Sequence, residues 1–452
     1  MLDSIIEYVQ TIISMPNIED LDVYHVIIGG SAIIILSYFA SLLAKKTNIP
    51  SVLVLIAMGI CIKKLIELFF GYGDIPNQNL ILELLGKVGL IFIVLEAALD
   101  LKLSKEKLPL IIKSASVSLI ILIFSSLGIA YLLQKVLLIE GIYALIYAIP
   151  VSIMSSAIII PSVSSLSQEK KEFMIYESTF SDIWGIMAFH LVIKNMDPSS
   201  TSEIAFSIGK TLGLALIIGI VVSYLLVYVL QKITSSVKVF LSIAVLLLIY
   251  SIQVKLELGG ELLSILIFGL MLNNSQIFFP KIFKNKNGES WFGSLLNKEK
   301  MKELSHDFHT QTLESAFVIR TFFFVMFGVT ISLSKIMNLE VVFYGLSISL
   351  ILYVARLVWL LLFRVKEPLS LLYIAPRGLI TVLLFFQLQT KSGEPYKQIQ
   401  QVAEGKFDPA IILVVILVTC LVMTFSLISQ RKAPLSNDVS IAGDASDSAE
   451  QV

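Results

Sequence analysis

The sequence predicts an all-α polytopic membrane protein with about thirteen transmembrane helices. Hydrophobic residues make up 56% of the 452-residue chain and charged residues only 15%, whereas charged residues are about a quarter of a soluble domain. The mean hydropathy is +0.87. A chain with so few polar side chains cannot cover its apolar surface in water, so we expect lipid to surround much of it.

A membrane-spanning helix needs about 20 mostly apolar residues, and the chain is divided into stretches of this kind. We expect spans near residues 25–44, 49–70, 80–101, 109–133, 141–166, 172–193, 205–230, 238–254, 258–274, 312–334, 340–363, 368–390 and 408–429. Together these spans predict a single transmembrane domain over residues 1–429.

Two stretches of the chain do not fit the pattern of spans. Residues 275–311 are rich in Lys and Asn, and their FPKIFKN and SWFGSLL pieces predict an amphipathic cytoplasmic segment at the membrane interface. Residues 430–452 form a polar tail of small side chains, which is typical of disorder.

The loop charges predict the orientation in the membrane. An arrangement with the N-terminus outside and the C-terminus in the cytoplasm places roughly twice as many Lys and Arg residues inside as outside, as cytoplasmic loops require. We therefore expect a multi-pass protein of the cell membrane. Lys+Arg and Asp+Glu are both 34, so no basic field indicates a nucleic acid partner.

Two predicted spans are interrupted near their middles. Thirteen spans can be divided into two inverted six-helix halves joined by the seventh, so that the fifth and twelfth spans correspond. The fifth contains Pro161 in SSAIIIPSVSS, and the twelfth contains Pro376 and Gly378 in IAPRGLITV. Paired interrupted helices in matching positions indicate a transporter site where broken helices cross, although two ordinary proline kinks would give the same pattern.

Charged side chains within the predicted spans are the main functional signal, because each costs about 2.5–3.5 kcal/mol or more at the bilayer centre. Asp182 is the strongest candidate, about ten residues from each end of the sixth span. Ser178 lies four residues earlier on the same helix face, and Ser181 precedes Asp182 directly. Carboxylate and hydroxyl oxygens suit a hard cation, whereas no His/Cys spacing typical of zinc occurs.

The chemistry predicted for Asp182 is exchange. A buried carboxylate can hold a proton or a monovalent metal cation in turn, and exchange becomes obligatory if only the loaded carboxylate moves between the two sides. An ion gradient then drives the cycle, and no nucleotide-binding motif is present, so we expect no cofactor. The alternative for Asp182 is a structural ion pair with an arginine.

The other buried charges have more than one interpretation. Glu177 is either a second bare acid beside Asp182 or, as we favour, the structural ion-pair partner of Arg377. Glu96 is either an auxiliary ion ligand or an acid that serves helix packing. Arg320 either fixes the site electrostatically or pairs locally with Glu314.

For Arg356 and for two histidines we expect no direct part in ion binding. Arg356 lies eight residues from the inner end of its span, and we expect it to snorkel or pack. His306 and His309 lie at the membrane edge, and we expect a solvated juxtamembrane pair rather than a pH sensor.

Several of these segments resemble the monovalent cation/proton antiporter superfamily, and the NhaP-like sodium/proton exchangers in particular. The motifs that carry the resemblance are TNIPSVLVLIAMGI, GLIFIVLEAALDL, YESTFSD, HTQTLESAFVIRTFFFVMFG and APRGLI. Their order and spacing match the family over roughly residues 25–429. YESTFSD is similar to the family's Gly-Glu-Ser-x-x-Asn-Asp motif, which places Glu177, Ser178 and Asp182 on its Glu, Ser and ion-carrying Asp. GLIFIVLEAALDL places Glu96 on a family acid, and APRGLI places Arg377 on the arginine that pairs with the motif's Glu.

The resemblance implies an antiporter that is not an enzyme, with sodium (or lithium or potassium) and protons as its substrates. It also implies a homodimer in the bilayer whose mobile core moves against a scaffold. Two departures from the family pattern occur. Ser181 replaces the Asn before the Asp, and Thr-Asp-Pro of the first broken span reads Ile159-Ile160-Pro161. Freed backbone carbonyls or Ser155, Ser156 and Ser162 are the available substitutes.

Three alternatives to sodium/proton exchange remain at this point. Potassium/proton exchange belongs to the same class and differs only in the ion. A non-transporting sensor that retained the fold is favoured by the missing Thr-Asp. An intramembrane protease would need paired catalytic groups, and the sequence contains no HExxH motif and no obvious second aspartate opposite Asp182.

Overall fold

The computed structural model describes residues 23–47, 50–70, 78–104, 106–163, 166–196, 201–232, 238–256, 258, 260–278, 298–330, 338–390 and 393–432. All regular structure in these ranges is helical, which confirms the predicted fold class. Five of the described stretches are both long and apolar enough to cross a membrane. They are Leu108–Val136, Gly141–Ser162, Glu303–Thr330, Leu339–Leu362 and Ala410–Gln430.

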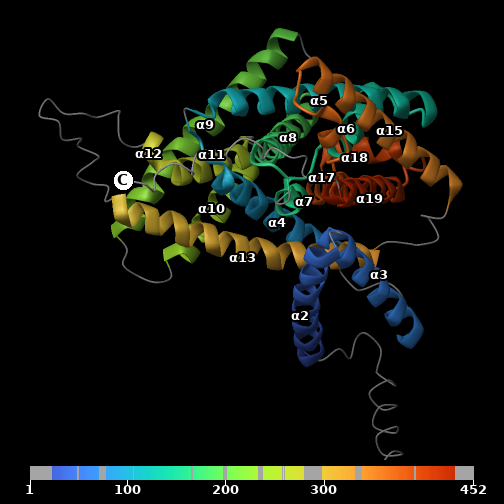
Figure 1. The fold of residues 1–452 in the computed structure, drawn as a ribbon, viewed down its shortest axis with the longest axis horizontal. Helices are drawn as coiled ribbons and strands as arrows, with labels where there is room; N and C mark the ends of the chain where they lie inside the picture. Colours follow the sequence, from blue (N-terminus) through green and yellow to red (C-terminus); the bar gives the residue numbers. More distant parts are fainter. Residues whose placement is uncertain are drawn as a thin grey trace, which may run out of the picture.

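The helices form two groups that lie side by side (Figure 1). The first group contains α2 (Val23–Thr47), α3 (Ser51–Phe70), α4 (Gln78–Asp100), α9 (Thr201–Lys232), α10 (Lys238–Lys255), α11 (Glu261–Asn273), α12 (Ser275–Phe278) and α13 (Lys298–Thr330). The second contains α5 (Leu108–Val136), α6 (Gly141–Ser152), α7 (Ser156–Ser162), α8 (Gln168–Lys194), α15 (Leu339–Leu362), α16 (Pro368–Leu372), α17 (Leu379–Thr390), α18 (Glu394–Ala403) and α19 (Ala410–Lys432). Between the groups, α4 packs on both α8 and α17.

The helix ends follow local sequence signals. The first turn of α5 contains Pro109, where the missing N–H of proline leaves no hydrogen bond unmade. At the start of α15 the side chain of Asn338 accepts a hydrogen bond from the backbone N–H of Glu340 at 3.0 Å, which satisfies one of the free donors of the first turn.

The first group is held together by close packing of α13 along α3. A Cβ atom on Gly59 would lie 2.2 Å from the carbonyl oxygen of Val325, and one on Gly328 would lie 2.4 Å from that of Ile56. Both positions therefore require glycine, because any side chain would force the two backbones apart. Such contacts between small residues are typical of helix pairs in membranes.

Helix α13 corrects one predicted boundary. The sequence suggested an interfacial segment up to residue 311 and a span from residue 312, but Lys298–Thr330 is one continuous helix. Residues 279–297 and 433–452 lie outside the described ranges, so the FPKIFKN and SWFGSLL pieces and the disordered tail remain predictions. Helix α18, an amphipathic helix between α17 and α19, was not predicted.

Candidate functional site

The two broken spans meet inside the second group of helices. The chain is extended between α6 and α7 and again between α16 and α17, and the backbone N–H of Ser155 donates to the carbonyl oxygen of Pro376 at 2.9 Å. Pro376 and Gly378 lie in the second break, as predicted. Pro161 does not mark the first break, because it lies inside α7. The helix is interrupted at Ile153–Ser155, six residues before Pro161.

This position changes the comparison with the family's Thr-Asp-Pro motif. The prediction placed that motif on Ile159–Pro161, where the chain is helical. The residues at the observed break and its exit are instead Met154, Ser155 and Ser156. The hydroxyl groups of Ser155 and Ser156 therefore lie where the first broken helix resumes, next to the apolar Ile153 and Met154.

Asp182 faces this break from the middle of α8. Its side chain is buried, and one carboxylate oxygen (Oδ2) accepts hydrogen bonds from both the hydroxyl of Ser156 and the backbone N–H of Ser156, the latter at 3.4 Å. The second oxygen (Oδ1) is buried without a hydrogen-bond partner. A buried polar atom of this kind is rare and needs an explanation.

A cavity of about 20 Å³ lies against Asp182, which is room for about one water molecule. It is lined by Ile93, Val94, Ala97, Asp182, Ile183, Ile186, Met187, Leu262, Leu263, Leu266 and Ile380. These residues come from α4, α8, α11 and α17, so the cavity lies where the two groups of helices meet. Among the described residues that line it, Asp182 is the only titratable one.

The two predicted hydroxyl neighbours of Asp182 have backbone partners. The hydroxyl of Ser178 donates to the carbonyl oxygen of Ile175 at 3.1 Å. The hydroxyl of Ser181 accepts a hydrogen bond from the backbone N–H of Met154 at 3.0 Å, and so ties α8 to the first break. Both side chains are buried. Their service as ion ligands stays a prediction.

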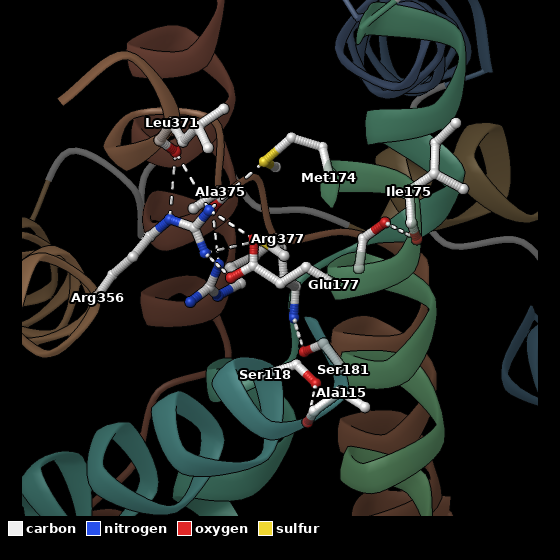
Figure 2. A network of polar contacts seen from close by, with 12 residues as sticks. Ala115, Ser118, Met174, Ile175, Glu177, Ser181, Arg356, Leu371, Ala375 and Arg377 are labelled. Carbon is white, nitrogen blue, oxygen red and sulfur yellow. Dashed lines mark hydrogen bonds and ion pairs between the residues drawn. The ribbon is translucent and has the colours of Figure 1, made fainter. Parts of the chain in front are cut away.

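Glu177 is paired with Arg356, not with Arg377 as we predicted (Figure 2). The Nη1 and Nη2 atoms of Arg356 donate to the two carboxylate oxygens of Glu177 at 2.6 and 2.9 Å, and Arg356 also donates to the carbonyl oxygen of Leu371. The Arg356 side chain is only 2% exposed, so of the two expectations snorkelling is wrong, and the side chain packs in the interior as one half of an ion pair. An arginine in mid-helix with no charged neighbour in sequence was a signal that an acid on another helix must pair with it.

Arg377 has a different task in the second break. Its Nε donates to the carbonyl oxygen of Val151 at 2.8 Å, and its Nη1 donates to that of Ala375 at 2.7 Å. Val151 belongs to the last turn of α6, where carbonyl groups lack helical partners. The predicted pair failed because Arg356 already binds both oxygens of Glu177, and the guanidinium group of Arg377 instead satisfies carbonyl groups freed by the breaks.

Glu96 and Arg320 approach each other across α4 and α13, with 3.5 Å between Oε2 and Nη1. One turn further along α4, Asp100 Oδ1 lies 2.8 Å from Nε2 of His309. Arg320 therefore pairs with Glu96 rather than locally along its own helix. Glu314, which we expected to be a buried charge, is exposed, and His309 is not simply solvated. The two acids of α4 thus face two basic residues of α13. The sequence alone could not predict these pairs, because it does not show that the two helices are neighbours.

Comparisons with known proteins agree with this arrangement. Residues 32–429 match the family model "Sodium/hydrogen exchanger, transmembrane". No curated protein sequence matches the chain. Two solved structures of the sodium proton antiporter MjNhaP1 from Methanocaldococcus jannaschii are similar in fold. The structure at pH 8 has a TM-score of 0.63 and 18% identity over 89% of this chain and 95% of that chain. The electron microscopy structure has a TM-score of 0.62 and 19% identity over 91% and 96%.

Proposed function

Because this chain belongs to the sodium/hydrogen exchanger family, we propose that it exchanges a monovalent cation, with sodium as the first candidate, for protons, and that Asp182 binds the two in turn. The observation that carries the proposal is the free oxygen of Asp182. The carboxylate is buried, one oxygen is bound by Ser156, and the other has no partner beside a small cavity.

The surroundings of Asp182 make its ionised carboxylate costly when no proton or cation is bound. Its neighbours in the cavity are aliphatic or Met side chains, and a buried carboxylate without a neutralising partner is strongly unfavourable. Both arginines of this region are engaged elsewhere, Arg356 with Glu177 and Arg377 with backbone carbonyl groups. A proton or a cation is then what neutralises Asp182, and the two compete for the same oxygen atoms.

This competition gives exchange rather than leak. The helices that carry Asp182 meet a smaller electrostatic barrier when they move Asp182 through the membrane in a neutralised form than when its carboxylate is charged. Each movement between the two sides therefore requires a proton or a cation bound to Asp182. One carboxylate at the cavity supports one cation per proton and hence electroneutral exchange. Oxygen atoms of Asp182, Ser156 and the open backbone of the break are suitable ligands for a hard monovalent cation.

Three neighbouring features belong to the same proposal. Glu96 lies on α4 next to the cavity residue Ala97, and we propose it as an accessory acid that Arg320 holds in the present state. We propose the Glu177–Arg356 pair as scaffold for α8. The excess of loop cations supports an N-terminus outside and a C-terminus in the cytoplasm, and the family resemblance supports a homodimer.

The test is flux in proteoliposomes containing the purified protein, with the membrane potential clamped. Sodium, lithium and potassium are offered separately at two pH values, and proton movement is followed with an internal pH dye. We expect sodium-driven proton movement that persists when the potential is clamped at zero. Proton movement driven by potassium alone would assign the potassium/proton alternative, and none with any cation would overturn the proposal in favour of a non-transporting protein.

A further inference from the structure

A second contact between the two groups of helices lies nearer the beginning of α8 than Asp182 does. The hydroxyl of Tyr176 donates to the carbonyl oxygen of Lys102 at 3.0 Å. Lys102 follows α4 directly, so this hydrogen bond joins α8 to the end of α4. Tyr176 is 5% exposed although it lies only eight residues after the beginning of α8.

Apolar side chains surround this hydrogen bond. Tyr176 forms a separate buried cluster with Leu101 and Ile111, and four partly buried side chains pack against it. These are Leu103, Leu110, Phe180 and Leu270. Members of the cluster come from α5, α8, α11 and the residues after α4, so the cluster fills the junction at which all four meet.

The segment that Tyr176 contacts is fixed to α11. The side chain of Asn274 accepts a hydrogen bond from the backbone N–H of Leu103 at 2.7 Å and donates to the carbonyl oxygen of Leu101 at 2.9 Å. Asn274 also donates to the carbonyl oxygen of Leu270. Residues 101–103 are therefore tied to the end of α11, whereas Tyr176 belongs to α8.

The cavity at Asp182 extends away from this cluster. Tyr176 precedes Asp182 by six residues, which is about 9 Å of helix rise. The cavity residues of α8 run from Asp182 to Met187, and those of α11 run from Leu262 to Leu266, whereas the cluster uses Phe180 and Leu270. Along both helices, the apolar cluster lies on one side of Asp182 and the cavity on the other.

We infer that Tyr176, the carbonyl group of Lys102 and the apolar cluster around them form the barrier that separates Asp182 from the membrane side at which α8 begins. The inference rests on the proposed function, because a barrier matters only if Asp182 exchanges ions with that side. It makes Tyr176 a positioning residue that holds α8 against the end of α4 in the closed state. A single neutral hydrogen bond suits this task, since it favours closure only about fivefold and can break in every cycle.

The experiment measures access to the cavity from each side. Ala97 lines the cavity and is replaced by cysteine in a Cys61→Ser background, since Cys61 is the exposed native thiol and Cys420 is buried. A membrane-impermeant maleimide is applied to right-side-out and to inside-out vesicles. We expect slow labelling of Ala97→Cys from the side at which α8 begins, and labelling about fivefold faster from that side when Tyr176→Phe is added.

Two further variants make the result decisive. Tyr353→Phe is the matched control, because the hydroxyl of Tyr353 is buried without a hydrogen-bond partner, and labelling should not change. Tyr176→Ala removes the ring as well and should speed labelling further. Equal labelling rates in wild-type, Tyr176→Phe and Tyr176→Ala backgrounds would overturn the barrier. Labelling does not depend on transport, so a protein without flux that still shows this pattern would refute the proposed function and leave the barrier standing.

Discussion

Arg356 on α15 binds both carboxylate oxygens of Glu177 on α8, at 2.6 and 2.9 Å, with both side chains almost fully buried. Glu177 lies five residues before Asp182 on α8, and Arg356 occupies both of its carboxylate oxygens. The pair also fixes α8 against α15 and against Leu371 at the entrance to the second break (Figure 2). The ion pair thus links α8 to the residues just before the second break.

The first prediction concerns this ion pair. Glu177→Gln and Arg356→Gln should each lower stability by about 3–5 kcal/mol, because each leaves one buried charge without a partner. The double variant should lose clearly less than the sum of the two, since the charges are removed together. Thermal unfolding of the purified proteins in detergent measures these losses. Arg377→Gln combined with Glu177→Gln is the control pair, and a stronger coupling there than with Arg356 would contradict the assignment.

The second prediction concerns the hydroxyl of Ser156. Ser156→Ala removes a hydrogen bond to the charged form of Asp182, which is worth about 1.5–3 kcal/mol. The proton should then hold Asp182 better against the cation. We expect the half-saturating sodium concentration at fixed pH to rise about tenfold or more. Ser162→Ala is the matched control, because the Ser162 hydroxyl donates only to the carbonyl oxygen of Ile158. An unchanged sodium requirement in Ser156→Ala would remove Ser156 from the site.

The third prediction tests the packing of α3 on α13. Gly328→Ala should lower stability by about 1–3 kcal/mol, because its Cβ would lie 2.4 Å from the carbonyl oxygen of Ile56. Gly213→Ala serves as the comparison, since a Cβ at that helical glycine meets nothing within 4 Å. It should be neutral or slightly stabilising. Equal unfolding temperatures for the two variants would show that the close approach is not present.

The fold and the location of the site could be predicted from sequence because lipid imposes simple constraints. Apolar length identifies spans, and a lone carboxylate in the middle of one stands out by its cost. Asp182, Pro376 and Gly378 all lie where the pattern placed them. The boundary of α13 could not be predicted in the same way, because its first half, with residues such as Lys300 and Glu303, is polar and gives no span signal.

The partners of the buried charges were harder to predict because pairing depends on which helices are neighbours. The sequence offered Glu177 two buried arginines, Arg356 and Arg377, and only the folded structure, in which Arg356 reaches Glu177 from α15, decides between them. The break before Ser156 was misplaced for a related reason. Proline is the obvious interruption, yet Pro161 is accommodated inside α7, whereas Met154 and Ser155 are extended because they bond to Ser181 and Pro376.

The central claim is that Asp182 binds the proton and the cation in turn, and sodium-driven proton movement in proteoliposomes tests it most directly. Asp182→Asn keeps the shape of the side chain and removes its charge, so it is compared with the wild-type protein at equal incorporation and with matched thermal stability. We predict that the variant gives only the proton movement of protein-free liposomes. Sodium-driven proton movement at the wild-type rate in Asp182→Asn would contradict the account.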